Sequence, residues 1–436
     1  MKILVVSQYW APENGVPQRR WSWLTQELTT AGHEVVVIAP KPHYERRVTV
    51  SQWWSGKMYR SFTSPTPGTS GEKIIRSGFF PSTRSLTGKV INQISVAFGS
   101  LWVILRKPAA LARFQPDVVI GTVPAIPTAA VTFIAAMRFN APYVVDLRDA
   151  WPDLLENHDQ WNQSVGKRSL KERVFRLGLV QSVSKLTKVA LNIVLRRAKV
   201  VIVTSSRLGE DLSSRKELRD QTRRPLRTVT IRNVFPPETC FVKGEYRKSQ
   251  YTPLHVLYAG TLGRAQHLEN AILAASICRS RGVDVKLRFV GSGAGLEKVK
   301  QLAEEMEVSV QFVPRQPAED LSAHYQWADT ALVHLTNWAA LDYVVPSKTY
   351  ELMEAGIHIS AVVAGETAAL IRDTEAGDVV VPENPSALAD LWSRLSETNG
   401  LVGFKSYASR WVNEQRDSIA EIELSRALSI ATEGNC

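Results

Sequence analysis

The sequence has few cysteines, and none of the cysteine spacings that hold metal ions or disulfides. Its 436 residues contain three cysteines, Cys240, Cys278 and Cys436, and no Cys-x-x-Cys pair. A zinc site or a disulfide framework needs paired or closely spaced cysteines. The sequence therefore argues against both, and it fits a reducing compartment.

Motifs for metal-dependent phosphate chemistry are also missing. The sequence has no Asp-x-Asp pair, no P-loop and no Gly-x-Ser-x-Gly turn. Carboxylates are the usual protein ligands of a Mg²⁺ ion that bridges phosphates. We therefore expect no metal and no resident cofactor, and we exclude P-loop nucleotide hydrolases and α/β-hydrolases.

Long apolar runs are scarce. The run at residues 2–7 is too short for a signal peptide and is predicted to be a buried first strand. Residues 118–137 carry no charge and are long enough to span a bilayer. Gly121, Pro124 and Pro127 interrupt this stretch early. It is therefore predicted to be a buried strand, a loop and a buried helix.

Positive charge is abundant, and much of it is local. The chain has a formal net charge of +11. Residues 165–200 contain ten Lys and Arg and a single acidic residue, Glu172, which gives this basic window nine net positive charges. A patch of this kind favours an anionic surface as its partner, either nucleic acid or membrane headgroups.

The order of the predicted elements is that of parallel α/β sheets. The chain begins with a strand, a loop of turn formers, a helix and a second strand, at residues 2–7, 8–15, 17–31 and 35–39. Such a βαβ unit with fully apolar strands is typical of a parallel sheet covered on both faces. Ligands bind beyond the carboxyl ends of these strands. Glu13, Asn14 and Gly15 are therefore candidate contact residues.

Two series of strands predict two domains. Strands of the first series are also expected at residues 118–120, 143–146, 200–204 and 228–231. Those of the second are expected at 254–259, 286–290, 310–313, 331–334, 359–363 and 379–381. We predict an α/β fold of two tandem, doubly wound, Rossmann-like domains at residues 1–235 and 250–405. A final helix at about residues 413–436 has no strand of its own and can pack back on the first domain.

Residues 90–105 form a predicted helix that has two interpretations. Apolar positions recur at helical spacing, and the remaining positions are Asn, Gln, Ser and Gly rather than charged residues. Such a helix can lie in a membrane interface or can be an ordinary packed helix. We favour the packed helix.

The segment 346–356 has the marks of a short helix that binds an anion. Pro346 and Ser347 suit a helix start, and Gly356 suits the left-handed residue after the end. A cation at Lys348 opposes the helix dipole unless an anion binds there. Glu351 lies on the same face and can accept sugar hydroxyls. The alternative is a surface ion pair between Lys348 and Glu351.

Two glycine-rich turns follow strands of the second series, at Gly260–Gly263 and Gly291–Gly293. Glycine lets a phosphate approach the backbone, although most glycines of such turns have a structural role. Each turn alone is weak evidence for phosphate binding.

Taken together, the motifs resemble the family-4 retaining glycosyltransferases, over nearly the whole chain. The matching segments are Tyr9–Gly15 with Arg20, Gly32–Val35, Asp149–Pro152, Tyr258–Glu269, Phe289–Gly293 and Pro346–Gly356. The resemblance implies the glycosyltransferase B fold, in which two Rossmann-like domains face a cleft. Asp149–Pro152 and the 260–269 segment are similar to the branch that builds bacterial surface polysaccharides, including aminosugar transferases.

Several positions depart from the family pattern. Of the Glu-x₇-Glu motif, Glu351 matches the second Glu, but Tyr343 stands where the first would be. Thr261 and Gln266 replace the usual Arg and Lys, so Arg264 is expected to supply charge together with Lys348. Where many members have His-Asp, this chain has Arg148-Asp149.

The resemblance assigns roles to these residues. Arg264, Lys348 and Glu351 would act on the donor and its departing diphosphate, and Asp149 would face the acceptor. Asp149 can equally be a partner of Arg148, and Glu366 can lie near the sugar or cap a helix. The donor-binding set is Gly260, Gly263, Gly291, Gly293, Ser347 and Glu366. The acceptor and phosphate loop is Glu13, Asn14, Gly15, Arg20 and Arg148.

The predicted function is a metal-independent retaining glycosyltransferase. It would move a hexosyl or aminosugar group from a nucleotide-sugar to a lipid-linked glycan at the cytoplasmic face of the inner membrane. The basic window 165–200 would hold the enzyme on anionic lipid, as a peripheral membrane protein. One alternative is a sugar-nucleotide 2-epimerase of the same fold. The other is a basic nucleic-acid or membrane binder, but no nucleic-acid module is visible and we expect no nucleic-acid partner.

Overall fold

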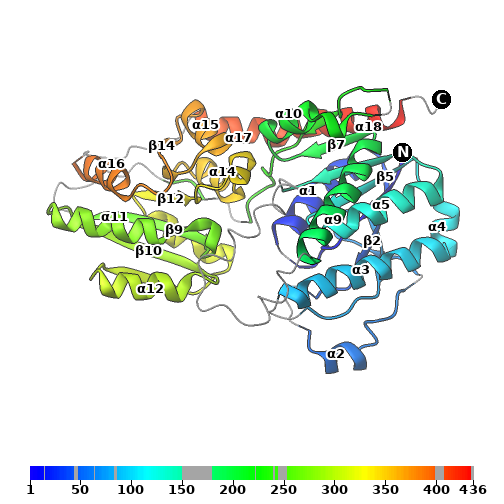
Figure 1. The fold of residues 1–436 in the computed structure, drawn as a ribbon, viewed down its shortest axis with the longest axis horizontal. Helices are drawn as coiled ribbons and strands as arrows, with labels where there is room; N and C mark the ends of the chain where they lie inside the picture. The colour runs from blue at the N-terminus through cyan, green and yellow to red at the C-terminus, as the bar shows by residue number, and fades with distance from the viewer. Residues whose placement is uncertain are drawn as a thin grey trace. The chain divides into compact units, whose positions relative to one another are not determined.

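The computed structural model describes residues 1–13, 15–43, 48–62, 64–82, 86–149, 179–220, 222–238, 241–243, 253–397 and 407–433. They form two compact units (Figure 1). Unit 1 combines the described residues before Pro236 with those after Ser418. Unit 2 contains the described residues of Pro236–Ser418.

Unit 1 is built on an eight-stranded sheet with the order β3-β4-β2-β1-β5-β6-β7-β8. The strands are β1 (Lys2–Val6), β2 (Glu34–Pro40), β3 (Thr66–Pro67), β4 (Lys73–Ser77), β5 (Val118–Val123), β6 (Tyr143–Leu147), β7 (Val200–Val203) and β8 (Thr228–Thr230). All pairs are parallel except β3 with β4. The chain order reverses between β1 and β5, so the loop after β1 lies at the switch point where such sheets bind ligands.

Helices cover this sheet. They are α1 (Val16–Thr30), α2 (Val50–Ser55), α3 (Leu86–Arg106), α4 (Ala109–Phe114), α5 (Ile126–Phe139), α9 (Leu179–Arg197), α10 (Ser206–Ser214) and α18 (Ala420–Thr432), with a 3₁₀ turn η1 (Lys216–Leu218). α3 packs against α5, and α5 packs against α9, so these three form one helical layer (Figure 1). The terminal helix α18 packs on β5, β6, β7 and β8.

Unit 2 has a six-stranded parallel sheet with the order β11-β10-β9-β12-β13-β14. The strands are β9 (Leu254–Thr261), β10 (Val285–Ser292), β11 (Val310–Val313), β12 (Thr330–His334), β13 (His358–Val362) and β14 (Gly377–Val380). Its switch point lies between β9 and β12. Both described sheets are therefore doubly wound, which confirms the predicted fold class.

The helices of unit 2 alternate with its strands. They are α11 (Glu269–Ser280), α12 (Leu296–Glu305), α13 (Leu321–Trp327), α14 (Ser347–Glu354), α15 (Gly365–Asp373), α16 (Pro385–Glu397) and α17 (Tyr407–Glu414). Short 3₁₀ turns are η2 (Arg264–Gln266), η3 (Ala318–Asp320) and η4 (Ala339–Tyr343). A π-helical turn, η5 (Gln415–Ile419), joins α17 directly to α18, so the chain leaves unit 2 and enters unit 1 within one helical segment.

The uncharged run at residues 118–137 forms β5, a short loop and α5. Only one helix of the described residues, Gly88–Arg106 in α3, is long and apolar enough to cross a membrane, and a third of it is buried. No element was predicted between residues 41 and 85, where the structure has α2, β3 and β4. β4 is short, and its Lys and Arg interrupt the alternation of apolar and polar residues by which a strand is predicted. Its pairing with β2 is what makes it a strand.

Candidate functional site

In unit 2, the donor-binding residues predicted from the sequence gather along one edge of the sheet. The carboxyl ends of β9, β10, β12 and β13 are neighbours in the sheet order. Because the strands are parallel, the helices that follow them start at that same edge. The turns after β9 and β10 and the starts of α14 and α15 therefore lie along this edge.

The two glycine turns are bonded to each other. The Leu262 amide donates to the Ser292 carbonyl at 3.1 Å, and the Gly295 amide donates to the Leu262 carbonyl at 2.9 Å. A Cβ on Gly291, whose φ is +152°, would lie 1.8 Å from the Gly260 carbonyl oxygen. A Cβ on Gly293 would lie 2.1 Å from the Leu262 carbonyl oxygen. Gly291 and Gly293 are therefore needed for backbone packing in this position.

Gly263 differs from these two glycines. Its backbone is extended, with φ −106°, a conformation that any residue can adopt. Its added Cβ would come close only to the flexible end of Gln266, at 2.6 Å. Packing therefore does not explain a glycine at this position, whereas close approach by a ligand would. Arg264 follows at once, in the turn η2, and is partly exposed.

The start of α14 carries Lys348 in a three-residue polar cluster. Its Nζ lies 2.7 Å from Glu351 Oε2 and donates to Tyr325 Oη at 3.1 Å. Tyr325, on α13, donates to the other oxygen of Glu351. Both charged side chains are partly exposed, and Tyr325 is buried. The ion pair considered from sequence is therefore present, and a buried hydroxyl holds it in one geometry.

The ends of α14 agree with the prediction from sequence. Pro346 precedes the first residue, Ser347, and no side chain in the described part of the chain caps the start. Gly356 has φ +66°, the left-handed conformation expected after the helix end. An anion at the uncapped start would meet the positive end of the helix dipole and the Lys348 ammonium.

Glu366 lies at the start of α15 and is buried. The preceding Gly365 has φ +61°, and a Cβ there would lie 2.2 Å from the Asp342 carbonyl oxygen. Thr367 Oγ1 donates to the Val344 carbonyl at 2.6 Å. These contacts bind the start of α15 to the segment that leads into α14, so Glu366 is placed next to the Lys348 edge of the sheet.

Unit 2 also contains a buried histidine that the sequence did not suggest. His334 ends β12, and its Nε2 lies 3.1 Å from Asn270 Nδ2. Burial, and to a lesser extent the nearby His267, lowers the pKa of His334 to about 3. His334 is therefore neutral at physiological pH and accepts a hydrogen bond from Asn270.

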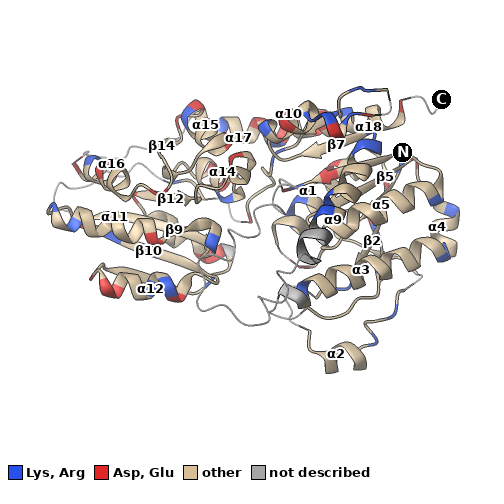
Figure 2. Ribbon diagram, viewed as in Figure 1, with Lys and Arg blue, Asp and Glu red and all other residues tan. Residues whose placement is uncertain are grey.

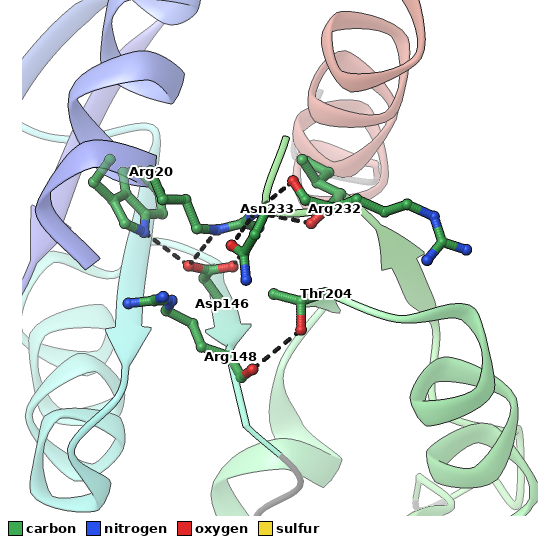
Figure 3. Close-up of polar contacts among 8 residues, drawn as sticks. Arg20, Asp146, Arg148, Thr204, Arg232 and Asn233 are labelled. Carbon is green, nitrogen blue, oxygen red and sulfur yellow. Dashed lines mark hydrogen bonds and ion pairs between the residues drawn. The ribbon is translucent and has the colours of Figure 1, made fainter. Parts of the chain in front are cut away.

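In unit 1, Arg20 is in the interior and not at a loop surface. Its Nη2 lies 2.9 Å from Asp146 Oδ1, and both side chains are fully buried. Nη1 donates to the Ile231 and Arg232 carbonyls at 2.9 and 3.1 Å and to Asn233 Oδ1 at 3.2 Å (Figure 3). This arrangement connects α1, β6 and the chain after β8, so Arg20 supports the unit from within and has no surface left for a ligand.

Asp146 completes this buried group. Its Oδ2 accepts a hydrogen bond from Trp21 Nε1 at 2.7 Å in addition to the bond from Arg20 Nε at 3.4 Å. Two side chains from α1 thus satisfy one carboxylate on β6, as a buried charge requires (Figure 3). The sequence marked Asp146 only as the end of a strand, because the partners are more than a hundred residues away.

Arg148 and Asp149 follow β6. The Arg148 carbonyl accepts a hydrogen bond from Thr204 Oγ1 at 3.1 Å, which fixes the backbone here (Figure 3). Burial lowers the pKa of Arg148, nearby Asp146 and Asp149 oppose this shift, and Arg20 adds to it. Arg148 Nε is buried without a hydrogen-bond partner among the described residues. The Arg148 guanidinium therefore has an N–H group that no described residue accepts, and it lies near the predicted Asp149.

The loop after β1 contains the other predicted residues of unit 1. Gly15 is the N-cap of α1, and Glu13 is buried, with its charge near His43 and Arg76. Asn14 lies outside the described residues. Gln18, in the first turn of α1, was not predicted; both polar atoms of its buried amide lack a partner among the described residues. Among the described residues no group of His, Cys, Asp and Glu could hold a metal ion.

Two family models match successive parts of the chain. The glycosyl transferase 4-like domain matches residues 15–231, and the glycosyl transferases group 1 model matches residues 245–416. A protein described as the colanic acid biosynthesis glycosyl transferase WcaI of Escherichia coli (strain K12) is 25% identical over 363 residues, with 82% of each chain covered.

Solved structures with the same fold include two bacterial proteins. Anabaena Alr3699/HepE in complex with UDP has a TM-score of 0.60 at 14% identity, covering 98% of this chain and 100% of its own. WaaG, a glycosyltransferase involved in lipopolysaccharide biosynthesis, has a TM-score of 0.59 at 15% identity, covering 99% and 100%. Since the two family models leave little of the chain unmatched, the chain belongs to the two-domain glycosyltransferases of family 4, as its motifs predicted.

Proposed function

We propose that this glycosyltransferase transfers a sugar from a nucleotide-sugar to a lipid-linked glycan in surface-polysaccharide biosynthesis, with retention of the anomeric configuration. The observation that carries the proposal is the Lys348–Tyr325–Glu351 cluster at the uncapped start of α14. A cation at a helix start opposes the helix dipole, and an anion bound there would offset that cost. The diphosphate of a nucleotide-sugar is such a ligand.

The cluster suggests how the donor is bound. Glu351 neutralises Lys348, and Tyr325 orients both side chains. When a diphosphate binds, Lys348 would turn to its oxygens and Glu351 would accept hydroxyl groups of a sugar ring. Arg264, beside Gly263, would bind the same diphosphate. As the bond between sugar and phosphate breaks, negative charge grows on the departing oxygen, and these cations stabilise it more than they stabilise the ground state.

Relatives support the nature of the two substrates. HepE has been solved with UDP and with UDP-glucose, and WaaG is involved in lipopolysaccharide biosynthesis. WcaI is described as acting in colanic acid biosynthesis. A donor with a nucleoside diphosphate and an acceptor that grows into a surface glycan follow by analogy. Neither the epimerase nor a nucleic-acid binder is favoured by these relatives.

The proposed place of work is the cytoplasmic face of the inner membrane. The basic window 165–200 is proposed to contribute to attachment, but residues 165–178 lie outside the described residues. In the described part, Lys185, Arg196, Arg197 and Lys199 are exposed. Each cation near an anionic leaflet contributes about 1 kcal/mol.

Donor binding and acceptor chemistry can be tested separately. Calorimetric titration with UDP-, GDP- and ADP-sugars should give binding for one nucleotide, and the Lys348→Ala variant should weaken it. Mass spectrometry of lipid-linked glycans from a host lacking the gene should show a chain that stops one sugar early. Release of free sugar or its epimer from the donor at full rate without any acceptor would contradict the transferase.

A further inference from the structure

Helix α3 has two opposite faces with different properties. Apolar side chains at Ile91, Ile94, Phe98, Trp102 and Leu105 are exposed, Phe98 to 68% and Trp102 to 56%. Their spacing of three or four residues places all five on one side of the helix. An apolar stripe about four helical turns long is costly to leave in water, so it indicates a partner surface.

The other face of α3 is fastened to unit 1. Val96, Val103 and Ile104 are buried there, together with the polar Asn92 and Ser100. Asn92 Nδ2 donates to the Phe80 carbonyl at 2.6 Å, and its Oδ1 accepts from Gln8 Nε2 at 3.2 Å. These buried hydrogen bonds would be lost if α3 left the sheet to cross a bilayer. The helix is therefore placed to lie along a surface with its apolar stripe outward.

A cavity of about 640 Å³ lies between this stripe and the α2 segment. Its lining includes Trp53, Tyr59, Phe80, Phe98 and Trp102. Polar groups around it are bonded to one another: Ser61 Oγ accepts from the Gly78 amide at 3.0 Å, and Ser95 Oγ from the Phe80 amide at 2.8 Å. The cavity thus offers mostly aromatic faces, in the size range of ligand pockets.

The charges around the stripe have one sign. Between residues 50 and 114 the sequence has nine Lys and Arg and one acid, Glu72. Glu72 is buried and accepts a hydrogen bond from Trp10 Nε1 at 3.0 Å. Figure 2 shows α2 and α3 without an acidic residue and α3 with cations at its ends. Arg106 lies 4.4 Å from the centre of the Trp102 ring, so aromatic and cationic groups alternate at the edge of the stripe.

A second apolar stripe lies in the same helical layer. α9, which packs on α5 beside α3, exposes Leu186, Val189 and Ile193 at the same three- and four-residue spacing. Exposed Arg196 and Arg197 follow one turn later. This part of α9 belongs to the basic window, so the apolar stripes and the cations occur in the same layer.

We propose that the exposed face of α2 and α3, continued by α9, inserts into the interfacial region of an anionic bilayer, and that the cavity receives part of a lipid chain. Aromatic rings at headgroup depth, an apolar stripe below them and cations around them match the three layers of a leaflet. This goes beyond attachment by the basic window alone, because insertion is not reversed by salt. It is independent of the donor chemistry, so its failure would leave the transferase proposal intact.

Vesicle flotation of the full chain tests the insertion. With phosphatidylglycerol-containing vesicles, Phe98→Glu and Trp102→Glu should each lower the partition coefficient at least tenfold, because a charge replaces an inserted ring. Ile422→Glu is the matched control: Ile422 is an equally exposed helical residue of unit 1, 58% exposed, away from this surface. It should bind as the wild type does. Circular dichroism should show all three variants folded.

Two further measurements distinguish interfacial insertion from purely electrostatic attachment and from a membrane-spanning helix. Lipids brominated on their chains should quench tryptophan fluorescence, and both Trp102→Phe and Trp53→Phe should reduce the quenched fraction, whereas Trp327→Phe in unit 2 should not. Alkaline carbonate should release the protein from membranes. Binding that high salt abolishes completely, unchanged binding of both Glu variants, absence of quenching, or resistance to carbonate would each overturn the proposal.

Discussion

The two units differ most in what they expose. Of the exposed large hydrophobic side chains among the described residues, eighteen belong to unit 1 and three, Val242, Val381 and Tyr407, belong to unit 2. Unit 1 instead buries its main ion pair, Arg20–Asp146, whereas unit 2 leaves Lys348–Glu351 partly open to solvent. The two units share the doubly wound fold but differ in their surfaces. Unit 2 has partly exposed charged side chains that a small polar ligand can contact, whereas unit 1 has an apolar outer surface.

The largest expected effect comes from the buried ion pair of unit 1. Replacement of Asp146 by Ala leaves the Arg20 guanidinium buried without its carboxylate, and Trp21 Nε1 without its acceptor. Loss of one partner of a buried pair costs about 3–5 kcal/mol of stability. Urea unfolding would measure this. The control Lys73→Met breaks an exposed pair with Glu34 and should cost under about 1 kcal/mol. Equal losses in the two variants would contradict a structural role for Asp146.

The open ion pair of unit 2 should matter for turnover and not for folding. Lys348→Ala and Glu351→Ala should each lower kcat/KM by about 30- to 1,000-fold, which corresponds to about 2–4 kcal/mol. The matched control is Lys300→Ala, which removes a cation from another pair three residues apart in unit 2, with Glu297. Steady-state kinetics of purified enzymes would measure the effect. Activity near that of the wild type in both variants would reduce the cluster to a surface ion pair.

A third prediction concerns pH. The pKa of His334 is lowered to about 3 by burial, while an unfolded chain has an ordinary histidine pKa near 6.5. The unfolded state therefore binds an extra proton between these values, so stability is full above about pH 6.5 and falls as the pH falls. From pH 7 to pH 5 this one group should remove about 2 kcal/mol. Urea unfolding of His334→Gln should show a shallower loss over that range; an identical slope would contradict the assignment.

The smallest expected effect is that of a chelator. Because the sequence lacks an Asp-x-Asp pair and the cations Lys348 and Arg264 are proposed to offset the diphosphate charge, excess EDTA should leave the rate unchanged. Sugar transfer would be measured after dialysis against chelator. Loss of activity that Mg²⁺ or Mn²⁺ restores would show that unit 2 needs a metal for its open charge cluster to act.

The local pattern of apolar residues and turn formers was sufficient to predict much of the fold. The apolar strands and the glycine and proline breaks predicted the strand that became β5, the helix that became α5 and the ends of α14. Elements defined by distant partners were not predictable in this way. β4 is a strand because β2 pairs with it, and α2 is held by contacts such as Trp53 Nε1 with the Phe79 carbonyl.

The candidate site shows the same contrast between residues that a local pattern predicts and residues that distant contacts bring together. Lys348 and Glu351 are three residues apart, so helical spacing alone brought them together. Tyr325 completes their cluster from another helix, and no local signal marks it. Arg20 was recognised by its motif and grouped with the acceptor and phosphate loop, because the sequence does not show that Asp146 is its buried partner. The remaining assignments of roles stay predictions until activity is measured.

The terminal helix has a consequence for how the protein is made. Leu424, Ala427 and Leu428 of α18 are buried against the strands of unit 1, although the 183 residues of Pro236–Ser418 separate this helix from the preceding part of that unit. During synthesis the chain of unit 2 emerges before this helix does. The part of the unit 1 sheet that α18 covers therefore stays open until unit 2 has been synthesised. A chaperone that protects the growing chain would meet these apolar strands during that interval.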